Sequence, residues 1–584
     1  FCCICKLNSA KIYIAATALA TVFATGCTNL DETLYDQVGS QNYYNTQMDV
    51  VRATFRPFEH AFWSIQSRHV LNELSADQLI TPTRDGWWDD GGRWRRLHYH
   101  TWTIEDGDAQ TEWNGCFQGI MQANYVIEDL SSLSSEKFGF TDDEFNNLKA
   151  QCRALRAWFY LRLLDAFRNV PLAVSFNDVS LNSEGQVEPK VIFEFIETEL
   201  KECLNLLTTK ETLGGNQGIQ GQWTKAAAAS LLVRLYLNAE TYIDENRYAD
   251  CATYAQEILD GKYGKYELAA TWDAPFDWNN ETCDEVIFGF PASQGYSYWH
   301  YQGDTYWWTV PARIRFYFND SKAKAGDHNC KYAASPSYDL SGNLYEYTLG
   351  MPIQKFRKYP EDERLKLYRN LGNNTREGMF LYGKLPYTDE NGELKYVPSP
   401  NSDYDLCIRD AVGKFHGLPE GQYPDDKTSN LTTGDHNSGW HFCKYPFYSD
   451  EDDQQMESDF TEIRLAEIVY SLAECKFRQG DVEGAAKLLN SVRKRNYPAE
   501  SWTRNLYAPE GQAQLTESEL LDEWGREFFA EGRRRIDLIR FGQFNSGRWW
   551  DKEADSDNHT EIFAITRDVL NANHNLKQNP GYDK

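Results

Sequence analysis

Flat aromatic side chains stand beside polar residues in three stretches that carry no helical pattern. Sugar rings have apolar C–H faces and a rim of hydroxyls, so a sugar site needs aromatic platforms with hydrogen-bonding groups around them. The first stretch, residues 85–94, contributes Trp87, Trp88, Asp89, Arg93 and Trp94. The second contributes Tyr296, Tyr298, Trp299, Tyr306, Trp307 and Trp308, and the third contributes Trp440. We predict a glycan face there; for any single ring, packing of the loop onto the protein body is an equal alternative.

Charged residues at helical spacing near the C-terminus could be read as a catalytic cluster. They are Arg526, Glu527, Glu531, Arg533, Arg534, Asp537 and Arg540. Alternating charges at such spacing are typical of ion pairs that tie helices together, which is the interpretation we favour. Glu467 and Glu474 form another candidate carboxylate pair, but a chain with this many acids contains such pairs by chance. The sequence therefore predicts no catalytic residue.

The spacing of the cysteines does not indicate a functional site. Nine of them follow Cys27 at wide spacings, and the mature part contains no C-x-x-C pair, so neither a zinc site nor another metal or cofactor is expected. Most of these cysteines lie among apolar neighbours, which predicts buried free thiols and at most one disulfide.

The N-terminus has the features of a secretory signal. Lys6 and Lys11 precede an apolar run from Ile12 to Ala24, and no acidic residue occurs before Asp31. Small residues then lead to Cys27, as in a bacterial lipobox, so residues 1–26 are predicted to be removed and Cys27 to be acylated. An ordinary secretory signal followed by a chance cysteine is the alternative.

Net charge excludes some partners. Removal of residues 1–26 shifts the formal charge from −28 to −30, because two lysines and no acids are lost. Such a chain repels nucleic acid and anionic lipid headgroups. No Pro-, Gly- or Ser-rich linker divides residues 27–584, so a single large body is expected.

Helical periodicity dominates four regions, which are 113–130 with 143–167, 191–207 with 224–237 and 247–259, 460–479 with 482–495, and 516–541. Thr224 is a predicted N-cap, and Thr516 with Glu519 a predicted capping box. The pairs resemble tetratricopeptide hairpins but lie far apart. We therefore predict a mainly α fold with a tetratricopeptide-like helix-hairpin scaffold. Long loop-rich insertions, at roughly 66–110, 269–320 and 321–459, carry a few short strands such as 285–290.

Six blocks in order resemble the SusD/RagB family of outer-membrane glycan-binding lipoproteins of Bacteroidetes-type bacteria. They are Trp113 with Asn124, residues 153–160 with 169–172, residues 223–227, residues 362–364, residues 464–467 with 473–474, and residues 527–534 with 537–542. The resemblance implies an N-terminal part at 27–268 and a C-terminal part at 269–584. All six blocks are mainly scaffold, so they indicate the fold more strongly than the ligand.

The same resemblance implies a function. A cell-surface protein held in the outer membrane by its lipid would bind an oligosaccharide and deliver it to a SusC-like TonB-dependent transporter. The acidic surface favours a neutral glycan. Two alternatives remain open, namely a secreted glycoside hydrolase on a helical scaffold and an assembly adaptor that binds no sugar.

Overall fold

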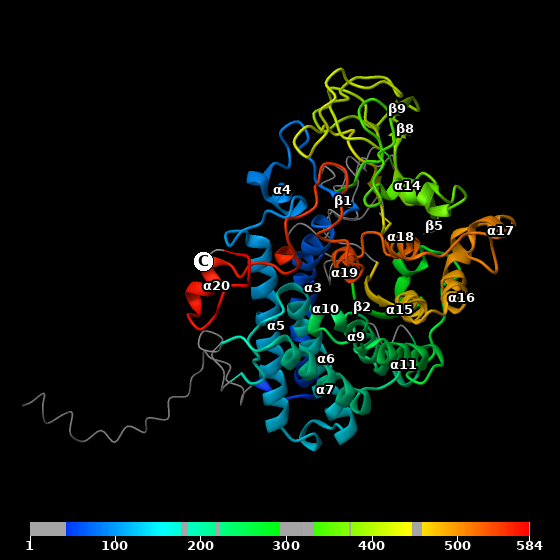
Figure 1. The fold of residues 1–584 in the computed structure, drawn as a ribbon. Helices are drawn as coiled ribbons and strands as arrows, with labels where there is room; N and C mark the ends of the chain where they lie inside the picture. The colour runs from blue at the N-terminus through cyan, green and yellow to red at the C-terminus, as the bar shows by residue number, and fades with distance from the viewer. Residues whose placement is uncertain are drawn as a thin grey trace, which may run out of the picture.

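The structure is a computed structural model, and it describes residues 43–176, 185–213, 215, 221–292, 317, 332–372, 375–446 and 458–582. Most of these residues belong to helices and their connecting loops (Figure 1). The longer helices are α3 (Gln47–Leu74), α5 (Gly107–Ser132), α6 (Asp142–Phe167), α7 (Pro189–Leu206), α9 (Lys225–Leu237), α11 (Tyr248–Leu259), α15 (Leu465–Arg478), α16 (Val482–Arg493) and α18 (Glu517–Glu527). The shorter ones are α4 (Arg93–His98), α10 (Ala239–Ile243), α14 (Pro352–Arg357), α17 (Trp502–Asn505), α19 (Arg534–Arg540) and α20 (Arg567–Ala572).

Strands are short and pair only two at a time among the described residues. The antiparallel pairs are β1 (Leu79–Ile80) with β3 (Ala333–Ala334), β2 (Val286–Phe290) with β12 (Phe460–Arg464), β4 (Arg369–Gly372) with β5 (Thr375–Glu377), β6 (Phe380–Leu381) with β11 (His441–Phe442), β7 (Gly383–Lys384) with β10 (Cys407–Ile408), and β8 (Pro386–Thr388) with β9 (Leu394–Tyr396). The predicted fold class, a mainly α scaffold with a few short strands in its insertions, is confirmed.

The helices form a continuous layered body. Helices α3, α5, α6 and α7 pack side by side, and α7 leads through α9 and α11 to α15 and α16 (Figure 1). One large hydrophobic core includes residues of both the N-terminal and the C-terminal helices. The loops around β8 and β9 lie at the opposite end of the molecule from α6 and α7 (Figure 1).

Local signals explain where several helices begin. Thr224 caps α9 by accepting from the amide of Ala227, as predicted. Thr516 accepts from the amide of Glu519 at the start of α18, but no reciprocal bond from Glu519 is present, so the predicted capping box is only half formed. Full capping boxes instead start α3, at Thr46 with Asp49, and α6, at Thr141 with Glu144.

Three predicted boundaries are wrong. Residues 460–464 form strand β12 instead of the start of a helix, because they pair with β2 and all five are buried. Residues 66–74 belong to the end of α3 and not to a loop. The predicted helix 516–541 is two helices, α18 and α19, separated at Gly532, whose φ is +73°.

Several residues of the family-like blocks join elements in the interior. Arg156 of α6 donates to Asn124 Oδ1 of α5 at 2.6 Å, and Asn124 Nδ2 donates to the carbonyl of Ala173 at 3.1 Å. Arg156 also forms an ion pair with Glu199 of α7. These buried bonds fix three helices and one loop relative to one another.

The cysteine prediction is confirmed for the described chain. Eight cysteines there are free, and all except the intermediate Cys283 are buried. Cys330 lies outside the described residues. No helix in the described ranges has both the length and the apolarity needed to cross a membrane.

Replacing Gly532 by valine is expected to destabilise the protein. The left-handed backbone there disfavours a β-branched residue, and an ideal Cβ would lie 3.4 Å from the His69 ring. We expect a loss of about 1–3 kcal/mol, seen as a lower melting temperature. Gly542→Val is the comparison, since its φ is also positive but its Cβ would meet open space, so it should lose only the backbone part of the stability. Equal melting of Gly532→Val and wild type would contradict the expectation.

Candidate functional site

The loop that precedes α4 has an unusual backbone. Residues Arg84 and Trp87 exchange two backbone hydrogen bonds, of 2.9 and 2.8 Å, around a two-residue Asp-Gly turn with positive φ at both central positions. Within residues 85–92, six have positive φ: Asp85, Gly86, Trp88, Asp90, Gly91 and Gly92. A left-handed Trp88 costs about 1–2 kcal/mol, so its surroundings must hold it in place. Such retained strain is a feature of binding sites.

The tryptophans of this loop lie in different environments. Trp87 is 47% exposed, whereas Trp94 is 2% exposed and belongs to the hydrophobic core. Trp88 lies between these extremes and packs against that core. The Trp94 indole donates to Asp90 at 2.5 Å, which ties the start of α4 to the loop before it. Trp94 was expected on the glycan face, but its buried ring offers no open surface.

The charged residues of the loop form local ion pairs. Arg93 pairs with Asp108 of α5, and its guanidinium lies 4.1 Å from the centre of the Trp94 ring. Asp89 pairs with Arg95 at 2.7 Å. Arg93 therefore covers Trp94 and anchors the start of α4 to α5, while Asp89, directly after Trp88, remains half-exposed.

A second segment, more than 300 residues later, packs against this loop. The Asp85 carboxylate accepts from Lys414 Nζ at 2.9 Å and from the Tyr404 hydroxyl at 3.4 Å. Arg84 forms a parallel bridge with Gly434. The ring centroids of Tyr404 and the exposed His416 are 4.3 Å apart. We name the surface formed by Asp85, Trp87, Tyr404, Lys414 and His416 the loop-platform surface.

Asp435 holds the second segment in shape. Its buried carboxylate accepts from the amides of Phe415 at 2.6 Å and Asn437 at 2.9 Å. Burial, together with repulsion from Asp85, raises the pKa of Asp435 to about 6. Hydrogen bonds to the backbone therefore order the segment that carries the loop-platform surface.

Trp440, the third predicted element, is 5% exposed. It stacks on Tyr382 with ring centroids 4.0 Å apart and an interplanar angle of 12°, and Arg357 lies 4.7 Å from its ring centre. Packing on both sides leaves Trp440 in the core, contrary to the expected surface position.

The remaining predicted site residues cannot be placed. Tyr296, Tyr298, Trp299, Tyr306, Trp307, Trp308 and Cys27 all lie outside the described residues. Their roles stay predictions. Sequence reasoning missed Tyr404, Lys414 and His416, since nothing in the sequence indicates that Tyr404 and Lys414 contact Asp85 or that His416 packs on Tyr404.

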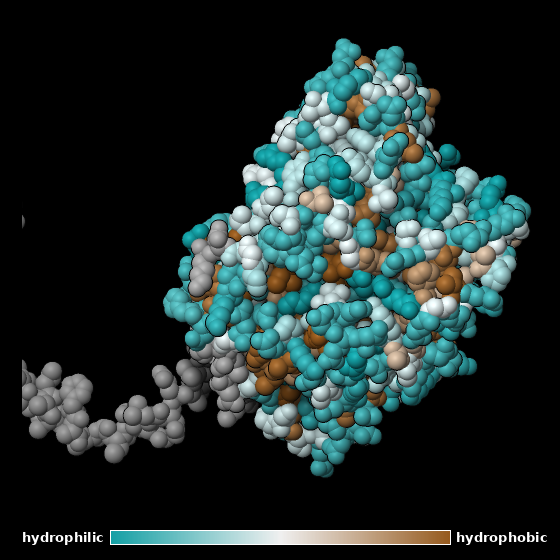
Figure 2. All heavy atoms as spheres, viewed as in Figure 1, coloured by the Kyte–Doolittle hydropathy of each residue, from teal (hydrophilic) through white to brown (hydrophobic). Residues whose placement is uncertain are grey.

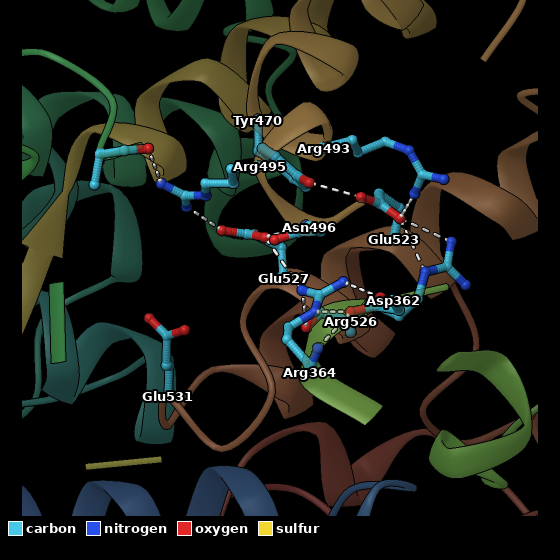
Figure 3. A network of polar contacts seen from close by, with 12 residues as sticks. Asp362, Arg364, Tyr470, Arg493, Arg495, Asn496, Glu523, Arg526, Glu527 and Glu531 are labelled. Atoms are coloured by element: carbon cyan, nitrogen blue, oxygen red, sulfur yellow. Dashed lines mark hydrogen bonds and ion pairs between the residues drawn. The ribbon is translucent and has the colours of Figure 1, made fainter. Parts of the chain in front are cut away.

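The C-terminal charge cluster is a structural network (Figure 3). Glu527 forms ion pairs with Arg464 at 2.8 Å, Arg495 at 2.7 Å and Arg364 at 3.3 Å. Glu523 similarly lies between Arg493 and Arg526, and it accepts from the Tyr470 hydroxyl at 2.7 Å. This outcome confirms the prediction that these charges tie the last helices to the body.

Both carboxylates of the candidate pair on α15, Glu467 and Glu474, are engaged in ion pairs with arginines. Glu467 binds Arg234 and Arg533, and Glu474 binds Arg540 and Arg478. Burial alone would raise the pKa of Glu474, but the two guanidiniums outweigh it and hold that pKa below its usual range. Glu474 is therefore not poised to donate a proton. In the described ranges, no group of three or more His, Cys, Asp or Glu side chains could hold a metal ion.

Two sets of buried carboxylates are expected to lower stability at opposite ends of the pH range. Burial opposes ionisation of Asp77, Glu462 and Glu519, but arginines and lysines outweigh it and hold each pKa at about 2. Their contribution is present above the unfolded pKa of about 4 and is lost as pH falls towards 2. Burial raises the pKa of Asp410 to about 7 and of Glu73 to about 8, so their contribution is lost as pH rises from about 4.

Melting temperatures measured from pH 3 to 9 test this expectation. Asp410→Asn should reduce the decline on the alkaline side, whereas Asp77→Asn should lower the melting temperature at pH 7 and reduce the decline on the acid side. An Asp410→Asn protein whose melting temperature falls as steeply as that of wild type between pH 5 and pH 8 would contradict the assignment.

Two family profiles match this chain. The profile described as "SusD family" covers residues 308–582, and the one described as "Starch-binding associating with outer membrane" covers residues 66–237. The starch-binding protein SusD of Bacteroides thetaiotaomicron is 26% identical over 533 residues, which are 88% of this chain and 84% of that protein. Together, the two profiles and this relative support the resemblance to the SusD/RagB family over most of the chain.

Solved structures share the fold. A SusD homologue from Bacteroides thetaiotaomicron matches with a TM-score of 0.66 at 17% identity, over 93% of this chain and 98% of that one. A laminarin-binding SusD-like protein matches with a TM-score of 0.62 at 18% identity, over 92% and 100% of the two chains. At these identities the likeness concerns the fold.

Proposed function

We propose that this protein binds a glycan at the cell surface and delivers it to a SusC-like, TonB-dependent outer-membrane transporter. The observation that carries glycan binding is the loop-platform surface, where an exposed tryptophan stands on a loop held in a left-handed conformation. The starch- and laminarin-binding relatives support the same class of ligand.

The geometry suits a carbohydrate. Trp87 offers an apolar ring face, and Asp85, Lys414 and His416 offer donors and acceptors for hydroxyls along one side. Because Asp85 is already ordered by Lys414 and Tyr404, little side-chain entropy is lost when a sugar binds. We propose that the aromatic residues 296–308 complete this face.

The charges on and around the loop-platform surface favour an uncharged ligand. The only cation assigned to the loop-platform surface, Lys414, is neutralised by Asp85, and the whole mature chain carries about thirty net negative charges. A polyanionic glycan would be repelled at long range. We therefore propose a neutral oligosaccharide or polysaccharide that is bound and released without bond cleavage.

A glycan panel tests the function. Purified protein is titrated by calorimetry with neutral and acidic polysaccharides, and each mixture is assayed for new reducing ends. We expect affinity for at least one neutral glycan and no new reducing ends. Reducing ends that increase with time would favour the hydrolase alternative, and absence of any glycan affinity would favour the adaptor.

Substitution of Cys27 by alanine is expected to release the protein from the membrane. A single acyl chain anchors only marginally, whereas several chains, each contributing about 0.8 kcal/mol per buried methylene, hold a protein firmly. Fractionation of cells that express wild type or Cys27→Ala measures the change. Retention of the variant in membranes of a strain without any partner transporter would contradict acylation at Cys27.

A further inference from the structure

A buried carboxylate beneath the loop-platform surface has no counter-ion. Asp435 is 0% exposed, and no lysine or arginine of the described residues forms an ion pair with it. Its oxygens accept instead from the amides of Phe415 and Asn437 and, at 3.4 Å, from the Asn437 side chain. Because burial of a charge without a counter-ion is costly, the protonated form of such a carboxyl group is favoured.

The hydrogen bonds of Asp435 place its charge directly under the loop-platform surface. The Phe415 amide donates to the Asp435 carboxylate at 2.6 Å. Phe415 lies between Lys414 and His416, which both belong to the loop-platform surface. The state of the Asp435 carboxyl group therefore acts on the backbone that carries two residues of this surface.

A second carboxylate, that of Asp85, lies close to Asp435. The Asp85 amide donates at 3.4 Å to the carbonyl of Gly434, the residue before Asp435, and Lys414 Nζ donates to the same carbonyl at 2.7 Å. Lys414 forms its ion pair with Asp85 and none with Asp435 in the described part of the chain. Repulsion between the two carboxylates is thus only partly compensated.

Water weakens this repulsion while the loop-platform surface is free. The region around α4 and the neighbouring loops is mostly hydrophilic, and the Asp85 side chain is 26% exposed (Figure 2). A bound glycan replaces part of this water and lowers the effective dielectric constant between Asp85 and Asp435. The repulsion is then stronger, so the protonated form of Asp435 is favoured further in the complex.

Several other titratable or charged groups lie around Asp435 on the elements packed against it. They are Arg84 and Asp85 of the loop before α4, Asp403, Tyr404, Lys414 and His416 of the second segment, and His436 and His441. Burial lowers the pKa of His436 to about 4 and that of His441 well below its usual range, so both stay largely neutral above pH 5. A hydrogen bond from Ser399 holds the pKa of Asp403 below its usual range. Histidine is a residue type that changes charge between pH 5 and pH 8, so the exposed His416 needs its own control.

We propose that glycan binding at the loop-platform surface is coupled to protonation of Asp435, so that the glycan is held more tightly at mildly acidic pH and released more readily at alkaline pH. This inference rests on the proposed function, since it concerns the regulation of the same surface. Asp435 is a positioning residue, because it is buried and acts on the glycan through Asp85 and the Phe415 amide.

The direction of the pH dependence follows from the two states of the carboxyl group. Burial, with added repulsion from Asp85, raises the pKa of Asp435 to about 6 in the free protein. A further rise in the complex means that binding takes up protons near this pH, and such binding weakens as pH rises. We expect affinity about three- to tenfold higher at pH 5 than at pH 8, with uptake of about 0.3–0.5 proton per bound glycan near pH 6.

Calorimetric titration of the purified protein from pH 5 to pH 8 tests the coupling. The probe is the neutral glycan that binds best in the panel, with soluble starch and laminarin tried first, because a neutral glycan does not itself titrate. Near pH 6 the titration is repeated in phosphate and in imidazole buffer, whose ionisation enthalpies differ, so the difference in apparent enthalpy gives the protons taken up. An affinity that does not fall between pH 5 and pH 8 would overturn the inference.

Two variants assign the proton to a residue. Asp435→Asn carries no charge at either pH, so its affinity should be constant within about twofold from pH 5 to pH 8. His416→Gln is expected to bind more weakly at every pH and to keep the wild-type ratio between pH 5 and pH 8. A ratio that persists in Asp435→Asn, or that disappears in His416→Gln, would show that another group takes up the proton.

A third variant covers the case in which Asp435→Asn does not fold, which circular dichroism shows. Asp85→Asn removes the repulsion and leaves Asp435 in place, so it should bring the affinity ratio below about twofold even though it also weakens binding. An undiminished ratio in Asp85→Asn would overturn the inference. A glycan that binds equally at pH 5 and pH 8 contradicts the coupling alone. If no neutral glycan binds at either pH, the proposed function fails and the coupling fails with it.

Discussion

Glu527→Ala is expected to produce little or no folded protein. The substitution leaves Arg464, Arg495 and Arg364 without their shared carboxylate in a site where all three guanidiniums are buried. Removing one partner of a buried ion pair costs about 3–5 kcal/mol, and here one carboxylate serves three partners. Since a folded protein is stable by only about 5–15 kcal/mol, the loss consumes a large part of the total.

Soluble yield and melting temperature measure this effect, and two further variants separate its causes. Glu527→Gln keeps the shape but removes the charge, so it should be nearly as damaging as alanine if the charge matters. Glu59→Ala breaks the Arg56–Glu59 pair, in which both side chains are more than 60% exposed, and should leave melting unchanged. A Glu527→Gln protein that melts like wild type would show that packing, and not charge compensation, is what Glu527 provides.

Removal of the aromatic platform is expected to abolish detectable glycan binding in a protein that remains folded. A stacking ring contributes about 0.5–1.5 kcal/mol beyond burial, so Trp87→Ala should weaken affinity about two- to tenfold. A second substitution, at Trp307 or Trp88, should weaken the affinity of a micromolar to millimolar site until binding is at the limit of detection. Calorimetric titration with the best glycan of the panel gives the change.

Alanine substitutions of Trp87 and Trp88 are expected to differ in their effect on stability. Trp87 is nearly half exposed, so Trp87→Ala should melt at the temperature of wild type. Trp88 packs against the core, so Trp88→Ala should lose some stability as well as affinity. Trp94→Phe is the matched control, since it alters a buried tryptophan of the same loop. If Trp87→Ala binds as tightly as wild type, the glycan face lies elsewhere.

The sequence by itself determined most of the helical scaffold. The apolar stripe of α6 and the alanine-rich sequence of α9 both favour a helix, and this preference is a local property that packing only reinforces, although nearly every residue of α9 is buried in the fold. The same holds for the C-terminal charges, whose spacing indicated ion pairs before any partner was known. The family-like blocks also predicted the fold, because they consist of scaffold residues such as Asn124 and Arg156.

Helix α3 is an element that the local sequence pattern does not predict. Its 28 residues include Pro57, and buried polar residues such as His69, Asn72 and Glu73 interrupt its apolar stripe. These side chains are satisfied only by distant groups, including the backbone around Gly532. Strand β12 is a similar case, since only pairing with β2 distinguishes it from the first turn of the following helix.

The candidate site depended most on tertiary structure. Trp87 and Trp94 are seven residues apart in one aromatic stretch and look equivalent in sequence, yet Trp87 is exposed in the loop and Trp94, in α4, lies in the core. Left-handed turns at residues 85–92 and the ion pair of Arg93 with Asp108 decide between them. The contact of Asp85 with Tyr404 and Lys414 joins segments more than 300 residues apart. Residue types and local spacing determined the helices and the chemistry that the loops could perform, whereas long-range packing decided which of their side chains reach the surface together.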